Sequence, residues 1–222
     1  TIMKPLNKYI DHTLLRASAT EKDITVLCEE AKEYDFYSVC VNPCNVRTAE
    51  ENLAGSDVRI VSVAGFPLGA SGTASKVCEA REACENGADE IDMVMNIGAL
   101  KSGFDKKVAS DISAVSAAVY DHDAVLKVII ETCLLSDEEI VKACRLAADA
   151  GADFIKTSTG FNGAGADAGK VALIKKTLEK TPGKNIRIKA SGGIKDRMTA
   201  EEMIKAGADR IGTSSSIAIM KG

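Results

Sequence analysis

The sequence lacks several features that define large functional classes of protein. Its 222 residues include no Trp, only two His and 4% aromatic side chains. No apolar segment approaches the ~20 residues that a helix needs to cross a bilayer, and residues 1–5 have no apolar signal-peptide core. Neither sign of charge dominates, because 28 Lys and Arg oppose 32 Asp and Glu. We therefore expect a cytoplasmic protein that binds neither a membrane nor a nucleic acid.

The histidines and cysteines form no recognisable metal or disulfide pattern. His12 and His122 are too few for a His-rich metal site, so we expect neither a metal nor another cofactor. The seven Cys are an odd number without a Cys-x-x-Cys pair, and several lie in apolar periodic segments. We interpret them as reduced thiols packed as small core residues. The remaining composition, 45% hydrophobic and 27% charged, is that of a globular protein that can bury a full core.

Short apolar, β-branched segments alternate with helical patterns along the whole chain. The expected strands are residues 9–15, 37–41, 59–64, 90–96, 125–131, 154–159, 186–191 and 210–214. Eight strands at roughly 28 residues per unit predict a small (β/α)8 barrel, and a doubly wound open sheet is the alternative. No linker or change of composition divides the chain, so we expect a single domain over residues 1–222. Capping boxes are predicted at residues 20–23, 136–139 and 199–202.

A repeated Gly-Ala-Asp sequence favours the closed barrel. It begins at Gly87, Gly151 and Gly207 and leads into the fourth, sixth and eighth expected strands. Alternate strands of a barrel contribute to the same interior layer. The shared register would place Asp92, Lys156 and Gly212 at a similar height, although Gly-Ala-Asp is also a common loop in α/β proteins.

Charged residues interrupt the middle of four strands that should be buried. They are Asp92, Lys127, Lys156 and Lys189. Side chains alternate across a strand, and the neighbours of these residues on the opposite face are apolar and suited to packing against helices. The charges should therefore point into the barrel.

The convergence of three lysines and one aspartate predicts amine chemistry. Burial and a nearby like charge both lower the pKa of a lysine, and a neutral amine attacks carbonyl carbons. A single strand lysine is more often a salt-bridge partner, here of Asp11 or Glu131. Four charges on adjacent strands favour a functional site. Cys40 on the second strand also faces inward, either as a reactive thiol or as a packed small residue.

The ends of the last two strands suggest a phosphate site. Strand seven leads into Ser191-Gly192-Gly193, and strand eight into residues 212–216, which include Ser214 and Ser215. Loops at these two positions commonly bind phosphate in such barrels. A loose GxGxxA pattern at residues 163–168 is not followed by an acidic residue for a ribose, and the chain has neither a P-loop nor a nucleophile elbow.

Taken together, several segments resemble the deoxyribose-phosphate aldolases over nearly the whole chain. The segments are residues 11–15, 65–69, 90–94, 126–132, 154–160 and 188–194. The resemblance implies a metal-free class I aldolase that cleaves 2-deoxy-D-ribose 5-phosphate to acetaldehyde and D-glyceraldehyde 3-phosphate in deoxynucleoside breakdown. Barrels of this kind often dimerise, so a homodimer is one expectation.

The resemblance also implies a role for individual residues. Lys156 would form the Schiff base, Lys189 would lower its pKa and relay protons, Asp92 would be the general acid/base, and Lys127 would complete the charge network. Asp11, Thr159 and Cys40 are further candidates for the site. The phosphate would be held by Gly160, Gly192, Gly193, Gly212, Ser214 and Ser215. Residue 161 is Phe where some relatives have a phosphate-binding Lys, and Lys195 could supply the missing charge.

Two other hypotheses stay open at this point. In one, the chain is a different phosphosugar enzyme, such as an isomerase, whose lysines act only electrostatically. In the other, it is a binder of phosphorylated metabolites that reuses the fold without chemistry.

Overall fold

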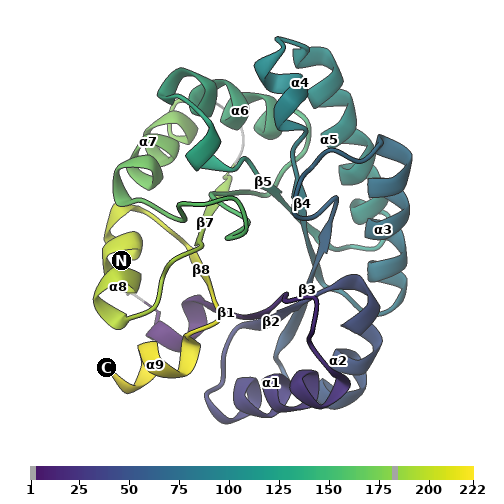
Figure 1. The fold of residues 1–222 in the computed structure, drawn as a ribbon, viewed down its shortest axis with the longest axis vertical. Helices are drawn as coiled ribbons and strands as arrows, with labels where there is room; N and C mark the ends of the chain where they lie inside the picture. Colours follow the sequence, from purple (N-terminus) through teal and green to yellow (C-terminus); the bar gives the residue numbers. More distant parts are fainter. Residues whose placement is uncertain (1–3, 182–184) are drawn as a thin grey trace.

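Eight parallel strands close into a barrel in the computed structural model, which describes residues 4–181 and 185–222 (Figure 1). The strands pair in chain order, and β1 pairs with β8 to complete the ring. They are β1 (Ile10–Leu14), β2 (Ser38–Val41), β3 (Arg59–Ala64), β4 (Glu90–Val94), β5 (Val125–Ile129), β6 (Phe154–Lys156), β7 (Arg187–Ser191) and β8 (Arg210–Thr213). All eight expected strands are present, and the predicted (β/α)8 barrel is confirmed.

Three strands end earlier than their apolar patterns predicted. β4, β5 and β6 end at residues 94, 129 and 156. Met95, Ile130 and Thr157 each still donate one backbone hydrogen bond to the neighbouring strand, and beyond them the chain forms loops at the barrel mouth. Glu131 has a φ of 56°, a left-handed conformation that a strand cannot contain. These early ends bring polar side chains into the mouth.

The helices surround the barrel on the outside (Figure 1). They are α1 (Glu21–Glu33), α2 (Val46–Leu53), α3 (Thr73–Glu85), α4 (Ile97–Lys101), α5 (Asp105–Tyr120), α6 (Asp137–Asp149), α7 (Ala168–Leu178), α8 (Arg197–Ala206) and α9 (Ser216–Lys221), with short 3-10 turns at Leu6–Tyr9, Pro43–Asn45 and Thr132–Leu134. In the described part of the chain, no helix has the length and apolar character needed to cross a membrane.

Helix start signals were identified correctly in two of three places. Thr20 and Ser136 each form a complete capping box with the residue three positions later. The capping box predicted at residues 199–202 is wrong. Helix α8 begins earlier, because the carboxylate of Asp196 accepts a hydrogen bond from the Thr199 N–H and so caps the helix at that point.

The apolar residues form two unequal groups. The large outer core packs the outward faces of the strands against the helices. The small inner cluster contains Leu15, Cys40, Val61 and Val63, with Phe66 packed against it. Charged side chains on β1, β4, β5, β6, β7 and β8 are also buried. This arrangement confirms the strand parity expected from the sequence.

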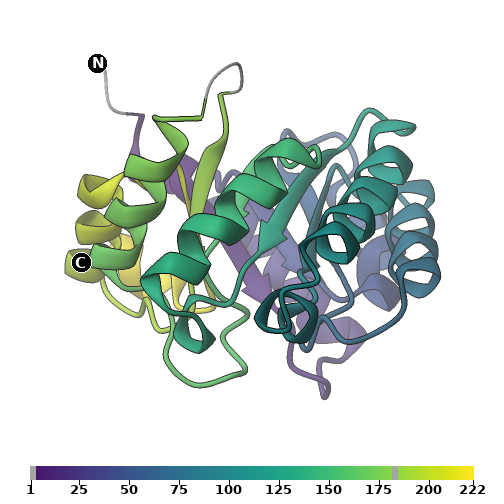
Figure 2. The same cartoon turned by 90° about the horizontal axis from the view of Figure 1, so that it is seen from above.

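One end of the barrel carries the long connecting loops. Figure 2 shows the β1–α1 loop and the β6–α7 loop projecting from the same end. This is the carboxyl-terminal end of the strands, where (β/α)8 enzymes place their active sites. An active site is therefore expected at this mouth, close to the charges beneath it.

Candidate active site

The four interior charges expected from the sequence meet around Asp92. One carboxylate oxygen of Asp92, Oδ1, lies 2.8 Å from the Lys127 ammonium. The other oxygen, Oδ2, lies 2.8 Å from Lys156 Nζ and also 2.8 Å from Lys189 Nζ. Strands β4, β5, β6 and β7 each supply one of these side chains, and all four are buried. Lys156 and Lys189 thus share one oxygen atom.

Three further buried charges extend this cluster. Asp11 Oδ2 lies 2.6 Å from Lys189 Nζ, and Asp11 Oδ1 accepts a hydrogen bond of 2.8 Å from the Arg210 guanidinium. Glu90 lies 2.5 Å from Lys127 Nζ and accepts two hydrogen bonds of 3.3 Å from Arg210. The cluster therefore contains four basic and three acidic groups.

The surroundings shift the pKa values of the two shared lysines in opposite directions. Burial lowers the pKa of Lys156 below its ordinary 10.5, and the Lys189 charge adds to this effect against the pull of Asp92. Burial also disfavours the ammonium of Lys189, but Asp11 and Asp92 outweigh burial and raise its pKa. Burial opposes ionisation of Asp92, yet the surrounding ammonium groups hold its pKa well below the usual range. Lys156 is thus the lysine of this cluster that loses its proton most readily.

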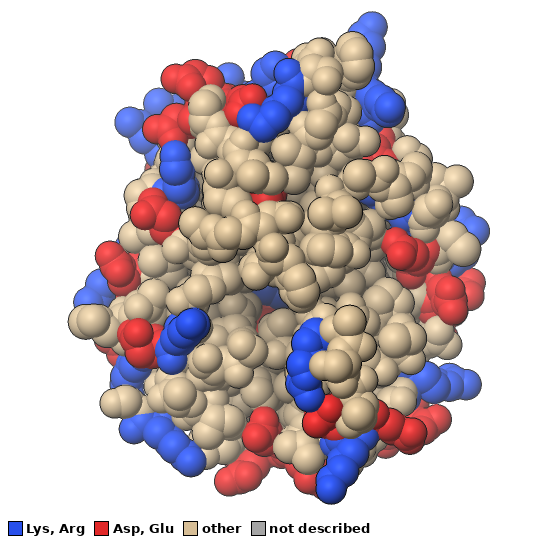
Figure 3. All heavy atoms as spheres, in the orientation of Figure 1, with Lys and Arg blue, Asp and Glu red and all other residues tan. Residues whose placement is uncertain are grey.

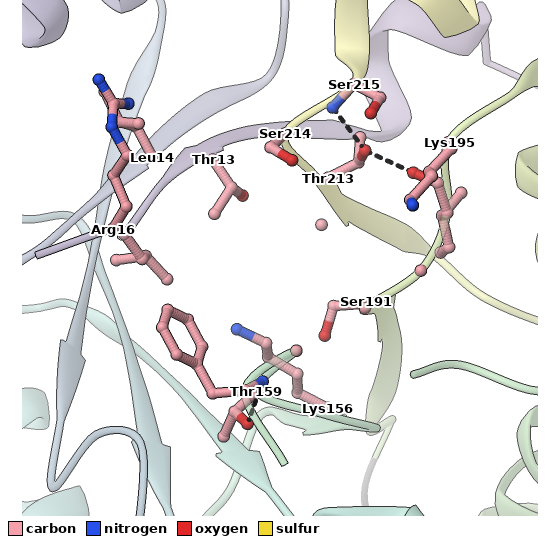
Figure 4. Close-up of a pocket in the computed structure, with 17 residues that line it drawn as sticks. Thr13, Leu14, Arg16, Lys156, Thr159, Ser191, Lys195, Thr213, Ser214 and Ser215 are labelled. Carbon is pink, nitrogen blue, oxygen red and sulfur yellow. Dashed lines mark hydrogen bonds between the residues drawn. The ribbon is translucent and has the colours of Figure 1, made fainter. Parts of the chain in front are cut away.

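Lys156 also lines a cavity at the barrel mouth. The cavity has a volume of about 450 Å³. Its wall includes Thr159, Gly160 and Phe161 from the β6–α7 loop, and Figure 4 shows the Lys156 amine directed into the space between the loops. Viewed from this end, the charged side chains lie mostly around the periphery, and blue atoms are visible at the base of a central hollow (Figure 3).

The opposite side of the cavity is built from the loops after β7 and β8. Gly192, Gly193, Ser214 and Ser215 all line it, and Lys195 points toward the same space (Figure 4). Gly192 and Gly193 have φ values of 85° and 75°, so two consecutive left-handed residues turn the chain there. Such turns direct backbone N–H groups to one side and suit an anion.

One hydrogen bond joins these two loops, and a second one orders the loop after β8. The Thr213 hydroxyl donates to the Ile194 carbonyl at 2.7 Å and accepts from the Ser215 N–H at 2.9 Å. Gly212 is required for another reason, because a Cβ atom there would lie 2.9 Å from Cε of Lys189. The absence of a side chain at residue 212 lets Lys189 extend to Asp92.

The remaining candidates lie in two places. Thr159 lines the cavity, and its hydroxyl donates to Glu131 at 2.5 Å. Glu131 accepts from Thr159 and Asn162, so the structure does not support its alternative role as a lysine partner. Cys40 lies in the small inner cluster, and burial raises the pKa of its thiol. This environment makes Cys40 an unreactive packed residue.

Four residues of the site escaped the sequence reasoning. Glu90 and Arg210 precede Asp92 and Gly212 by two positions, so strand parity would have placed both inside the barrel. Thr13 likewise follows Asp11 by two and lines the cavity. Arg16 also reaches the cavity wall, but no sequence pattern marks it, and its guanidinium pairs with Asp23 at 2.7 Å.

The donor set does not form a metal centre. Within residues 4–181 and 185–222, no three His, Cys, Asp or Glu side chains are arranged to hold a metal ion. The interior carboxylates are instead occupied by ammonium and guanidinium groups. The arrangement is suited to amine chemistry on a carbonyl compound that carries an anionic group.

Comparisons with known proteins agree with this geometry. The family model of the DeoC/LacD family aldolases matches residues 6–221. A deoxyribose-phosphate aldolase of Brevibacillus brevis is 56% identical over 217 residues, which cover 98% of this chain and 96% of the relative.

Solved structures give the same result. The aldolase QR15 is 44% identical with a TM-score of 0.92, and the match covers 99% of this chain and 96% of that one. A deoxyribose phosphate aldolase from Aeropyrum pernix, described as tetrameric, is 33% identical with a TM-score of 0.90 and covers 97% of this chain and 89% of that one. The resemblance noted from the sequence is confirmed, and the chain belongs to the DeoC/LacD family of aldolases, which makes it a carbon–carbon lyase.

Proposed function

We propose that this aldolase cleaves 2-deoxy-D-ribose 5-phosphate through a Schiff base on Lys156. The observation that carries the proposal is the position of the Lys156 amine. It is buried, lines the cavity, and shares the Asp92 Oδ2 atom with Lys189. The names of the relatives supply the substrate, and the seven free cysteines suit a reducing compartment such as the cytoplasm.

Counting charges in the interior supports a neutral Lys156. With four basic and three acidic groups, the cluster balances when one base is uncharged. Lys156 is the lysine whose pKa is lowered, whereas the pKa values of Lys127 and Lys189 are raised. An unpaired buried charge is costly, so the balanced state is favoured.

The reaction then follows from the chemistry of the neutral amine. Lys156 Nζ adds to the C1 aldehyde of the open-chain sugar, and the carbinolamine loses water to form a cationic imine. A base removes the C3 hydroxyl proton, the C2–C3 bond breaks, and its electron pair moves toward the imine nitrogen. Glyceraldehyde 3-phosphate leaves, and the enamine takes a proton at C2. Water then hydrolyses the imine, which releases acetaldehyde and restores the amine.

Asp92 and Lys189 are the proposed proton-transfer groups. Asp92 Oδ2 is 2.8 Å from the Lys156 nitrogen, and Lys189 Nζ is 2.8 Å from the same oxygen. A water molecule would extend the reach of both groups to the substrate. The Asp92 carboxylate also stabilises the cationic imine. Lys127 holds the other oxygen of Asp92 and fixes its orientation.

The loops after β7 and β8 are the proposed phosphate site. Gly192, Gly193, Ser214 and Ser215 would supply N–H and hydroxyl donors, with Gly160 nearby, and Lys195 would supply the positive charge that Phe161 does not. Binding the remote phosphate positions C1 at the amine. We assign the enzyme to deoxyribose phosphate breakdown on the same basis.

Borohydride trapping tests the Schiff base. With the substrate or with acetaldehyde, sodium borohydride should inactivate the enzyme and leave a reduced adduct on Lys156, located by peptide mass spectrometry. Lys156→Arg should form no adduct and lose aldol cleavage. Full activity in Lys156→Arg, or an adduct on another lysine, would refute the assignment.

A second variant tests the phosphate site separately. Lys195→Met should raise KM for deoxyribose 5-phosphate by about tenfold, the effect of one lost charge-assisted contact. It should leave cleavage of unphosphorylated deoxyribose unchanged. An equal loss on both substrates would contradict the phosphate assignment.

A further inference from the structure

Six buried charges form a closed ring of alternating sign beneath Lys156. In order around the ring they are Arg210, Asp11, Lys189, Asp92, Lys127 and Glu90, which returns to Arg210. Successive members lie 2.5–3.3 Å apart. Three positive and three negative groups make the ring neutral overall. Lys156 lies outside it, attached through Asp92 Oδ2.

Glu90 and Arg210 occupy the part of the ring farthest from the cavity. Each lies two residues nearer the amino end of its strand than Asp92 and Gly212, respectively. Both are almost fully buried. Because Asp92 and Gly212 lie between them and the barrel mouth, Glu90 and Arg210 do not contact a substrate held at Lys156.

A contribution to stability is a weak explanation for this pair. Removing charged groups from water costs several kcal/mol per ion, and buried ion pairs often contribute little net stability. Within residues 4–181 and 185–222, the buried Arg210 Nε atom has no hydrogen-bond partner, so not every donor of the guanidinium is satisfied. What the pair does provide is one positive and one negative charge that complete a neutral ring.

The balance of the ring acts on Lys156 through space. Charges on the order of 8 Å apart in a protein interior still interact strongly enough to move a proton equilibrium by about one pH unit. A ring lacking Arg210 has a net negative charge and would attract a proton to the Lys156 amine. A ring lacking Glu90 has a net positive charge and would repel one.

We propose that Glu90 and Arg210 are positioning residues that set the pH at which the Lys156 amine becomes reactive, by keeping the ring neutral. This inference rests on the proposed Schiff-base function and extends it to two residues that never meet the substrate. It predicts opposite effects for the two residues. If the two residues had only a structural role, the loss of either one would weaken the site in the same way.

The other groups that face Lys156 do not replace this pair. Cys40 on β2 is buried, and its raised pKa keeps the thiol uncharged. Strand β3 contributes apolar Val61 and Val63 to the inner cluster. Lys195 and Arg16 lie at the cavity wall and are unchanged in every variant below.

The test measures imine formation with acetaldehyde as a function of pH. Each enzyme is mixed with acetaldehyde for a short time, reduced with borohydride, and analysed by mass spectrometry for the N-ethyl group on Lys156. The variants are Glu90→Gln, Arg210→Met, Arg210→Lys and the double variant Glu90→Gln/Arg210→Met. Circular dichroism checks that each one folds.

The inference gives a distinct result for each variant. The acidic limb of the pH–rate profile should shift to lower pH by about one unit in Glu90→Gln. It should shift to higher pH by about one unit in Arg210→Met. Arg210→Lys keeps the charge and should keep the wild-type limb. The double variant should also return to it, because the ring is again neutral.

Other outcomes separate this inference from the proposed function. Absence of any wild-type adduct on Lys156 would refute the proposed function. A wild-type adduct, together with an unmoved limb in Glu90→Gln or shifts in the same direction in both single variants, would overturn the ring inference alone. If Arg210→Met does not fold, Glu90→Gln still tests the inference. An acidic limb shifted to lower pH supports it, and an unmoved limb overturns it.

Discussion

Lys189 and Lys156 contact the same oxygen of Asp92, so replacing Lys189 with Met removes the positive charge nearest the proposed nucleophile. Met has a similar length and no charge, and it fills most of the space left by the lysine. In the variant, Asp11 keeps its contact with Arg210, and Asp92 keeps its contacts with Lys127 and Lys156. We expect Lys156 to take up a proton, which restores equal numbers of positive and negative groups and lets the barrel fold.

The expected size of the effect follows from Coulomb's law. Each ammonium nitrogen is 2.8 Å from Oδ2 of Asp92, so the two lie less than about 6 Å apart. At an effective dielectric constant of about 20, their repulsion is about 3 kcal/mol. Removing it should raise the pKa of Lys156 by about two units, since one unit corresponds to ~1.4 kcal/mol. The fraction of neutral amine below that pKa, and with it kcat/KM at neutral pH, should fall about 100-fold.

The assay is the pH dependence of kcat/KM for deoxyribose 5-phosphate, which reports the free enzyme. The acidic limb in Lys189→Met should move up by about two pH units, and much of the lost activity should return at high pH. Lys189→Arg keeps the charge and serves as the matched control, with a limb close to that of the wild type. A profile of unchanged shape in Lys189→Met, lowered equally at every pH, would refute the electrostatic role and leave Lys189 only a part in proton transfer.

Three further predictions concern the loops and the stability of the barrel. Gly165→Ala should raise KM for the phosphorylated substrate by about tenfold and leave KM for unphosphorylated deoxyribose unchanged. The reason is that the new Cβ would lie 1.9 Å from the Gly192 carbonyl oxygen and displace the proposed phosphate loop. Steady-state kinetics on both substrates test this prediction. His12→Ala should lower the free energy of unfolding by about 1–3 kcal/mol, because buried Ser216 and partly buried Glu30 lose their hydrogen bonds to the imidazole. Urea denaturation measures this change. Borohydride should still trap Lys156 in the variant. The folded state holds the pKa values of Asp11, Glu90 and Asp92 below their ordinary 3.8, 4.5 and 3.8, so these groups contribute stability above about pH 5. That stability should be lost as pH falls through and below 4, where the unfolded chain binds protons first, and a free energy of unfolding that stays constant down to pH 2 would contradict it.

Much of the fold was predictable because it depends on local pattern. The alternation of short apolar strands with capped helices identifies eight strand–helix units, and the boundaries missed were strand ends such as Glu131, where a backbone turn overrides apolar character. The capping box expected at residues 199–202 failed for a similar reason. Asp196 competes for the same Thr199 N–H, and the pattern alone does not rank the two candidates.

The direction of the charged side chains was also predictable, but their partners were not. Strand parity places Asp92, Lys127, Lys156 and Lys189 inside the barrel from the sequence alone. Parity says nothing of which oxygen each ammonium reaches. It therefore does not reveal that Lys156 and Lys189 share one atom, or that Arg210 and Glu90 close a ring.

The sequence by itself determined the barrel, the set of inward charges and the glycine and serine loops at one end, since each follows from periodicity or backbone chemistry within a few residues. Only the tertiary structure decided that residues on β1, β4, β5, β7 and β8 meet in a neutral ring, with Lys156 left outside it. The physical reason is that a pKa depends on the distances and signs of all charges around a group. Those distances exist only after the barrel closes and joins the first strand to the last.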